Sequence, residues 1–325
     1  MTTTTSSCLL CGSERLGLLY QGVRDHFGIA RGEYRFLRCE ACGSATLDPL
    51  PAPDEIPGFY PPEYTFRMAD PDQPALRRFL RSLEWQLFYG PSYRTRLGTF
   101  RRLTGLGSGL ILEVGCGAGL FLRLLADAGY GVEGVDISGE DVAYARDRLG
   151  LKVVRSTLED LALSGARYDA VHLFYVLEHV LNPSDTVRQV FAVLKPGGWM
   201  AFGVPVIDSR QGTLLGSRWS EVTEAPRHLT IPSRPGLERL LRRTGFSDVR
   251  SAPMPLLDNA KAVVLSLLPG AATPQSYGQS GSVTLMLRRC AAALLLAPAL
   301  VLALADRPPL AAGAAPGMMM FCARK

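Results

Sequence analysis

The stretch LILEVGCGAG, residues 110–119, decides the fold. It opens with an apolar run of strand length, carries glycine at positions 115, 117 and 119, and leads into an amphipathic segment. Glycines permit a tight turn and let a ligand approach the backbone, and a helix that follows such a turn offers unpaired N–H groups to a carboxylate or phosphate. The stretch predicts a strand, a cofactor-binding turn and a helix. Alone it does not single out one cofactor, because dinucleotide-binding proteins use a similar turn.

Strand-length apolar runs alternate with amphipathic segments after this stretch, a pattern typical of βαβ units on a parallel sheet. We therefore expect an α/β protein with a doubly wound, mostly parallel, seven-stranded sheet. The expected strands are residues 110–114, 131–136, 152–155, 168–174, 199–204, 247–252 and 318–323, and the expected helices are 120–128, 140–149, 183–194 and 234–244.

Asp136 ends the second expected strand, about twenty residues after the glycine turn, where a carboxylate can accept hydrogen bonds from both hydroxyls of an adenosine ribose. That position suits NAD and other adenosine cofactors equally. Residues 112–119 closely resemble the first motif of class I S-adenosylmethionine-dependent methyltransferases. Residues 135–138, 168–171, 176–180 and 194–198 resemble that family's later motifs in order and spacing. The resemblance covers about residues 109–246 and implies a Rossmann-like enzyme that binds S-adenosylmethionine; an NAD-dependent dehydrogenase is the residual alternative.

The resemblance also implies a role for each matching residue. The turn of Gly115, Cys116, Gly117 and Gly119 would lie under the methionine part of the cofactor, and Glu113 would hold the loop or the amino group. Asp136 with Ile137 would bind the ribose, Leu158 and Glu159 would flank the adenine, and Phe174 would lie near the sulfonium. Ser156-Thr157 departs from the Gly-Asp pair of many relatives, which puts the contact to the adenine amine in question.

His179 and His228 are the candidate catalytic residues, because a neutral imidazole can accept a proton near pH 7. His179 follows a strand, at the sheet edge where open α/β sheets bind ligands, although it can equally be a structural residue that anchors its loop. His228 lies in residues 224–229, EAPRHL, which resemble the substrate-side segment of methyltransferases that act on sugars and small metabolites. Arg227 beside it is either a partner for an acceptor phosphate or carboxylate or a surface arginine.

Four cysteines form two identical knuckles, Cys8-x2-Cys11 and Cys39-x2-Cys42, each followed by a glycine. Two residues between cysteines let both thiolates face one ion, and two knuckles give tetrahedral sulfur coordination. We expect structural zinc, with iron or metal-free thiols as the alternatives. Together with residues 49–64, this zinc ribbon resembles the N-terminal module of bacterial methyltransferases of sugar and surface-glycan biosynthesis.

The chain divides into a zinc-ribbon module (1–66), a helical connector (67–108), a cofactor-binding domain (109–254), an apolar helical insertion (255–316) and a last strand (317–325). Within the insertion, residues 290–305 carry no charge after Arg289 and contain Pro298. This run is shorter than the ~20 residues that a membrane-spanning helix needs. It is expected to be either half of a buried hairpin or a helix at a membrane surface.

The net charge of +5 is scattered without a basic run, so no nucleic-acid partner is expected. The first residues lack the charged and apolar regions of a secretory signal, so we expect a cytoplasmic protein, at the inner face of the membrane if residues 290–305 contact lipid. The leading hypothesis is methyl transfer to an oxygen or carbon of a sugar, nucleotide-sugar or lipid-linked glycan. The alternatives are a quinone- or polyketide-like acceptor, or a catalytically silent binding protein. The oligomeric state stays open.

Overall fold

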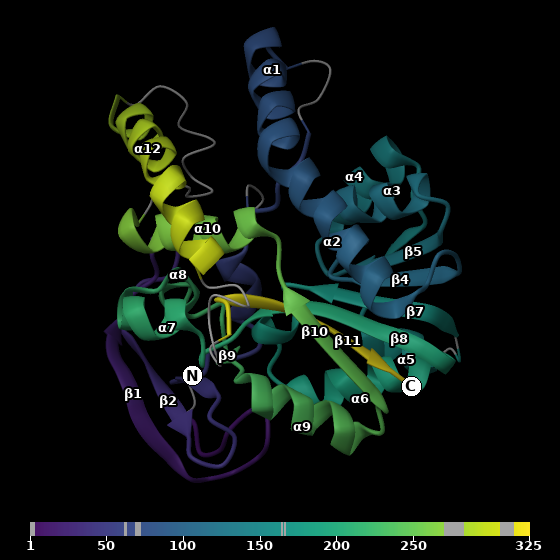
Figure 1. Ribbon diagram of the computed structural model, residues 1–325, viewed down its shortest axis with the longest axis horizontal. Coiled ribbons are helices and arrows are strands. Elements are labelled where there is room, and N and C mark those ends of the chain that lie inside the picture. The colour runs from purple at the N-terminus through teal and green to yellow at the C-terminus, as the bar shows by residue number, and fades with distance from the viewer. Residues whose placement is uncertain are drawn as a thin grey trace.

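The computed structural model describes residues 4–61, 64–68, 73–163, 165, 167–269, 283–305 and 315–325, and only the backbone of residues 162–163 and 283–290. Its centre is a seven-stranded sheet (Figure 1). Six strands run in the same direction, and the last strand of the chain lies antiparallel between two of them. In sheet order the strands are β10 (Asp248–Pro253), β11 (Met318–Arg324), β8 (Leu194–Pro205), β7 (Tyr168–Phe174), β4 (Leu110–Val114), β5 (Gly131–Asp136) and β6 (Val153–Arg155). The predicted doubly wound, mostly parallel sheet is confirmed.

Helices cover both faces of this sheet, which explains why its central strands are apolar on both sides. On one face, side chains of α6 (Pro183–Val193) and α9 (Arg234–Thr244) join the core beneath β7 and β8, and Leu158 of α5 (Leu158–Leu163) extends it. On the other face lie α2 (Gly90–Thr104), α3 (Leu120–Asp127) and α4 (Gly139–Leu149). The expected helices are all present within two residues of their predicted bounds at either end.

The fifth expected strand begins earlier than predicted. It was expected at residue 199, but β8 starts at Leu194, which pairs with Tyr168 of β7. Lys195 lies within this extension and its ammonium binds both carboxylate oxygens of Asp169, at 2.9 and 2.8 Å. Gly197 takes a positive φ of 78° there, a conformation that glycine adopts without strain. A Pro-Gly-Gly sequence that reads as a turn is thus held against the sheet by tertiary contacts.

A second, four-stranded sheet joins the N-terminal region to a distant part of the chain. Its strands are β1 (Leu16–Val23), β2 (Tyr34–Cys39), β3 (Ala45–Asp48) and β9 (Thr230–Ile231). The sequence predicted a zinc-ribbon module over residues 1–66. The hydrophobic core around this sheet instead combines Phe36 and Leu47 with Trp219, Leu229 and Ile231. The N-terminal strands therefore share their core with residues that lead up to β9.

The remaining helices cluster at one end of the molecule and around the second sheet. The π-helical turn η2 (Trp85–Tyr89) joins α1 (Ala75–Glu84) to α2, and α10 (Leu256–Leu267) packs against α12 (Val283–Ala305). Among the described residues, no helix combines the length and the apolar character needed to span a membrane. Shorter turns are η1 (Ile56–Phe59), η3 (Leu177–His179), α7 (Arg210–Leu215), η4 (Gly216–Arg218) and α8 (Ser220–Thr223).

Candidate active site

The glycine turn lies at the carboxyl end of β4. The amide of Gly115 donates to the carbonyl of Val135 over 2.8 Å, which ties the turn to the neighbouring strand. Gly115 has φ +66°, and a Cβ there would lie 2.6 Å from Cγ2 of Val176. Both the conformation and the close contact require glycine. The same contact brings the loop after β7, which leads to His179, against the glycine turn.

Asp136 holds the next part of the turn in place. Its Oδ2 accepts a hydrogen bond from the amide of Gly117 and its Oδ1 one from the amide of Ser138, each at 2.8 Å. Burial raises the pKa of Asp136, while these amides oppose the shift. The neighbouring Ile137 is 61% exposed, an unusual position for a large apolar side chain beside a polar turn. An adenosine would give Ile137 an apolar partner and use the remaining lone pairs of Asp136.

Glu113 and Arg96 are both buried close to the turn. Oε2 of Glu113 has no hydrogen-bond partner, and burial raises the pKa of this carboxyl to about 8, against the effect of Arg96. The guanidinium of Arg96 stacks on Phe174 at 4.5 Å, and Asp258 lies 3.5 Å from it. An unpartnered buried carboxyl and a buried guanidinium are suited to the ammonium and carboxylate of a methionine moiety. Sequence reasoning missed Arg96, which lies outside every recognisable motif.

The predicted adenine side is only partly formed by the expected residues. Leu158 is buried, whereas Glu159 is exposed and borders an open hollow of about 420 Å³ next to Asn182 and Asp185 of the α6 region. The hydroxyls of Ser156 and Thr157 donate hydrogen bonds to Asp160 of α5, at 3.0 and 2.9 Å. These two residues, where the sequence departs from many relatives, therefore cap the start of α5.

His179 and His228 lie together, with ring centroids 4.7 Å apart. Nδ1 of His179 lies 3.0 Å from the carbonyl of Arg227, and Nδ1 of His228 lies 2.7 Å from the carbonyl of Glu221. A carbonyl only accepts, so both Nδ1 atoms carry the proton and both Nε2 atoms keep a free lone pair. Burial lowers the pKa of His179 to about 3 and also lowers that of His228. The structure therefore brings the two predicted catalytic residues together as neutral imidazoles.

Two buried glutamates border these histidines. Burial and the nearby Glu224 raise the pKa of Glu221 to about 8. Burial also opposes ionisation of Glu224, but His228 and Arg227 outweigh it and lower the pKa of Glu224 to about 2. Oε2 of Glu224 lies 3.9 Å from Nε2 of His228, and Oε1 accepts a 2.6 Å hydrogen bond from the hydroxyl of Tyr64. One neutral and one ionised carboxyl thus lie beside the two imidazoles.

Arg227 is neither a surface residue nor a free anion-binding group. Its guanidinium donates to both carboxylate oxygens of Asp25, at 3.2 and 2.6 Å, and both side chains are fully buried. It also stacks on Phe27 at 4.6 Å. The prediction that Arg227 meets an acceptor phosphate or lies at the surface is wrong, because its charge is already matched by an acid of the N-terminal region.

The segment after η1 connects the histidines to the glycine turn. The hydroxyl of Tyr60 lies 3.1 Å from Nδ1 of His179, and Tyr64 binds Glu224. Thr65 then contacts the turn, since a Cβ on Gly117 would lie 3.2 Å from its Cγ2. Arg67 completes the path with a 2.8 Å hydrogen bond to Asp141 of α4. We call residues 60–67 the strap; the structure describes it except at 62–63, and sequence reasoning missed its role.

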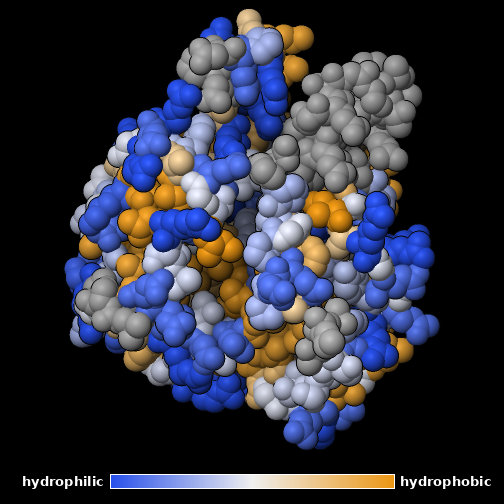
Figure 2. Space-filling view, turned by 180° about the vertical axis from the view of Figure 1, so that it is seen from behind, coloured by the Kyte–Doolittle hydropathy of each residue, from blue (hydrophilic) through white to orange (hydrophobic). Residues whose placement is uncertain are grey.

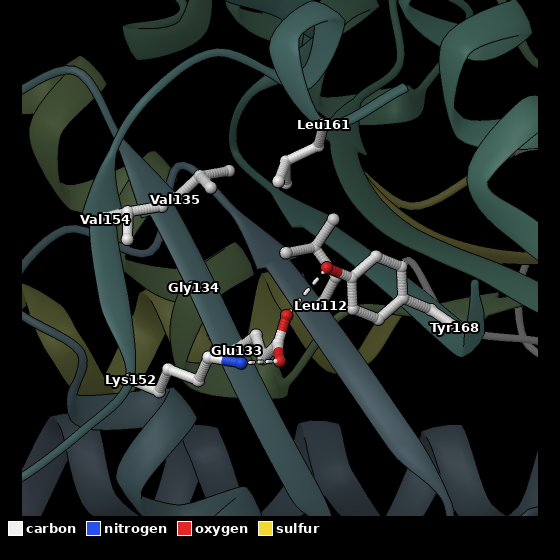
Figure 3. A pocket seen from close by; sticks show the side chains of 8 residues that line it. All are labelled: Leu112, Glu133, Gly134, Val135, Lys152, Val154, Leu161 and Tyr168. Carbon is white, nitrogen blue, oxygen red and sulfur yellow. Dashed lines mark hydrogen bonds and ion pairs between the residues drawn. The ribbon is translucent and has the colours of Figure 1, made fainter. Parts of the chain in front are cut away.

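On the face turned away from Figure 1, a hollow runs down the middle of the molecule and hydrophobic residues line much of it (Figure 2). A separate, much smaller depression lies over β5 and β6, under Leu161 of α5 (Figure 3). Its volume is about 30 Å³, too small for a nucleoside. Glu133, one of its lining residues, accepts a 2.8 Å hydrogen bond from the Tyr168 hydroxyl and forms an ion pair with Lys152. Because these polar groups satisfy one another, this depression is a structural feature of the sheet.

The four knuckle cysteines converge as predicted. Sγ of Cys8 lies 3.6 Å from that of Cys42, Sγ of Cys11 lies 3.6 Å from that of Cys39, and all four are free thiols within 4.8 Å of one another. Four thiolates around zinc at ~2.3 Å would be separated by roughly 3.8 Å, so the arrangement fits a tetrahedral ion. With all four positions taken by sulfur, no position remains for a substrate.

The central part of the chain matches a known protein family. Residues 93–251 match the family model described as a methyltransferase domain. The ubiquinone biosynthesis O-methyltransferase of Bordetella avium is 38% identical over 114 residues, which are 33% of this chain and 47% of that protein. The same enzyme of Nitrosospira multiformis is 37% identical over 113 residues, with the same shares. The chain thus spans about half the length of the curated relatives it matches.

The solved structures that this chain matches have low sequence identity to it. A protein from Thermotoga maritima, described as an S-adenosylmethionine-dependent methyltransferase and possible histamine N-methyltransferase, is 20% identical with a TM-score of 0.48; the match covers 76% of this chain and 96% of that one. A methyltransferase of the same class from Mesorhizobium loti is 18% identical with a TM-score of 0.46, over 72% and 98%.

Proposed function

Because residues 93–251 match the family model of a methyltransferase domain, we propose that this chain transfers a methyl group from S-adenosylmethionine to an oxygen of a small molecule. One observation carries the proposal. The glycine turn contacts Val176, and three residues later His179 lies edge-on to His228 with both Nε2 lone pairs free. The loop after β7 thus contacts the cofactor-binding turn and carries one of the two neutral imidazoles.

The residues around the turn fit S-adenosylmethionine, which supplies an electrophilic methyl group on a sulfonium when bound. Arg96 would hold the methionine carboxylate and Glu113 the ammonium. Asp136 would bind the ribose hydroxyls, with Ile137 and Leu158 against the adenine. The unpartnered Oε2 of Glu113 and the exposure of Ile137 support this assignment. Phe174, packed against Arg96, would line the path to the acceptor.

The acceptor side supplies proton transfer and orientation. We assign Nε2 of His228 as the base that takes the proton of the acceptor hydroxyl. The ionised Glu224 beside it would stabilise the imidazolium that results. His179, held by the carbonyl of Arg227 and close to Tyr60, would orient the acceptor with its own Nε2. Methyl transfer needs this positioning more than an elaborate set of acids and bases.

The relatives named as ubiquinone biosynthesis O-methyltransferases favour a ring hydroxyl of a quinone-like acceptor. A sugar, nucleotide-sugar or lipid-linked glycan, methylated on an oxygen or a carbon, is the second candidate acceptor. It is favoured by the buried polar groups around the histidines, which suit a polyhydroxylated ligand. The ribbon cysteines would bind structural zinc in either case.

The experiment that tests the proposal is calorimetric titration of the zinc-replete chain with S-adenosylhomocysteine, with NADH as the comparison ligand. We expect saturable binding of S-adenosylhomocysteine and none of NADH. A folded chain that binds neither ligand, or binds only NADH, contradicts the proposal. Turnover with phenolic, quinol and sugar acceptors then separates the two acceptor classes.

The Asp136→Ala variant is expected to bind S-adenosylhomocysteine at least about 30-fold more weakly, since it loses ribose hydrogen bonds to a charged group worth ~1.5–3 kcal/mol each and two hydrogen bonds that hold the turn. Calorimetry gives the affinity and elemental analysis gives the zinc content, which should not change. The exposed Asp147→Ala variant on α4 is the matched control. Loss of zinc together with affinity would indicate global unfolding instead.

A further inference from the structure

Exposed large hydrophobic side chains are concentrated at one end of the molecule. Four other exposed hydrophobic residues, Leu18, Ile137, Val154 and Leu214, are scattered over the rest of the described chain. The others lie on α1 and η2 (Leu76, Phe79, Leu80, Leu83, Leu87, Phe88), at the end of α10 (Leu267) and on α12 (Leu294, Val301, Leu302, Leu304). Soluble surfaces rarely gather apolar groups in this way unless something covers them.

Helix α1 is amphipathic but has no buried residue. Its apolar positions 76, 79, 80 and 83 follow the i, i+3, i+4, i+7 spacing of one helix face, and position 87 of η2 continues the stripe. Leu76 and Phe79 are 69% and 63% exposed. A stripe of this kind normally packs on a core, but among the described residues Leu80 and Leu83 are still 49% and 39% exposed.

Helix α12 buries small side chains and exposes large apolar ones, which is the reverse of the usual pattern in a helix at a water-facing surface. Its small residues Ala299 and Ala303 are buried against α10, whereas Leu294 is 79% exposed and Val301 also points outward. Thus neither expected arrangement of residues 290–305 describes it alone. The helix is half of a hairpin through its alanines and presents its larger side chains on the outside.

Helices α1 and α12 project from the same end of the molecule (Figure 1). They are linked through α10, which packs against α12 and also contacts α2, the continuation of α1. Their exposed apolar side chains form an apolar end that suits insertion into a lipid surface.

Charge at this end favours an anionic surface. Arg77 and Arg78 are exposed beside the apolar stripe of α1, and Arg81 follows one turn later. Among the described residues of α1, η2 and 291–305, the one acidic side chain is Glu84, which pairs with Arg81 at 3.2 Å. Apolar stripes flanked by arginines are typical of helices that lie at the interface of anionic membranes.

We propose that α1, η2 and α12 form a docking surface for the anionic face of a lipid bilayer. The helices would lie in the interface and not cross it. Helices α2 and α10, which adjoin these elements, reach the loop that leads to His179, because Ser92 of α2 and Tyr175 after β7 both donate to Asp258 of α10, at 2.6 and 2.9 Å. Delivery of an apolar acceptor from the bilayer rests on the proposed function, whereas docking itself does not.

Co-sedimentation of the full, zinc-replete chain with vesicles tests the proposal. We expect binding to vesicles of equal parts phosphatidylglycerol and phosphatidylcholine, and at least about tenfold weaker binding to phosphatidylcholine alone. The Leu76→Glu/Phe79→Glu and Leu294→Glu/Val301→Glu variants should each bind the anionic vesicles at least about tenfold more weakly. Arg77→Gln should weaken this binding about fivefold, since a basic residue near such a surface contributes ~1 kcal/mol.

The matched control is Leu18→Glu/Leu214→Glu, which replaces two exposed hydrophobic residues away from this end and should bind vesicles as the unchanged chain does. Unchanged binding of S-adenosylhomocysteine shows that each variant is folded, and it separates a failure of docking from a failure of the proposed function. Absence of vesicle binding by the unchanged chain overturns the proposal. So does a dimer in solution that Leu76→Glu/Phe79→Glu converts to a monomer, because a second copy would then be the occupant.

Discussion

The His228→Ala variant is expected to have a kcat lower by about 100- to 10,000-fold and an unchanged affinity for S-adenosylhomocysteine. The range is that of a positioned general base. The reason is the tautomer of His228. The carbonyl of Glu221 fixes the proton on Nδ1, so Nε2 is free to take the proton of the substrate hydroxyl. Single-turnover kinetics with saturating cofactor measure the effect on the chemical step, and calorimetry measures the affinity.

His228→Asn separates the base from a structural anchor. An asparagine amide can still donate to the carbonyl of Glu221 but cannot accept the proton at the position of Nε2. We expect it to be as inactive as His228→Ala. Recovery of most of the activity in His228→Asn would mean that His228 only holds its loop and that the base lies elsewhere.

The pH dependence of this step follows from burial. A base acts in its deprotonated form, so the rate falls as the pH drops through its pKa. Because burial lowers the pKa of His228 below the usual 6.5, the fall occurs at a lower pH than for an exposed histidine. The single-turnover rate should therefore be flat from about pH 6.5 to 7, below the pKa of about 8 of the neighbouring Glu221. A fall centred on pH 6.5 or above would contradict the assignment of a buried neutral imidazole.

Removal of zinc is expected to abolish acceptor turnover while cofactor binding persists. Structural zinc contributes ~10–16 kcal/mol of apparent binding free energy in small modules, so the ribbon should unfold without it. The ribbon supports the acceptor side directly: β3 pairs with β9, and the hydroxyl of Ser233 binds the carbonyl of Cys42. We expect Cys39→Ser/Cys42→Ser to lose zinc and at least about 100-fold in turnover, with an affinity for S-adenosylhomocysteine within about threefold of the unchanged chain.

A milder variant tests the same link without touching the cysteines. Asp25→Asn removes the charge that matches the buried Arg227, a change that typically costs ~3–5 kcal/mol, while the zinc content should stay at one per chain. Full turnover in either variant would show that the ribbon does not support the acceptor side. Loss of cofactor binding in the cysteine variant would show that the ribbon supports the whole domain.

The cofactor side was predictable because its signals are local. Strand β4, the glycine turn and α3 occupy consecutive residues, and periodicity fixed the bounds of α9 at Arg234–Thr244 without error. The convergence of the cysteines was predictable as well, since the spacing of each knuckle determines where two thiolates point. The early start of β8 was missed because a Pro-Gly-Gly sequence resembles a turn until its partner strand is known.

The acceptor side was only partly predictable because its contacts are long-range. Arg227 binds an aspartate 202 positions earlier in the chain, and Tyr64 binds a glutamate 160 positions later. No local pattern carries such pairs. Strand β9 is two residues long and exists because β3 offers it an edge. The two histidines could be named from sequence, but their tautomers and the ionised Glu224 required the fold.

The strap has a consequence for the order of events in a catalytic cycle. Thr65 lies against Gly117 of the cofactor turn, while Tyr60 and Tyr64 of the same segment bind His179 and Glu224. A cofactor that exchanges by displacing this segment also dismantles the acceptor site. We expect such an enzyme to bind its cofactor before its acceptor and to release the methylated product before the spent nucleoside.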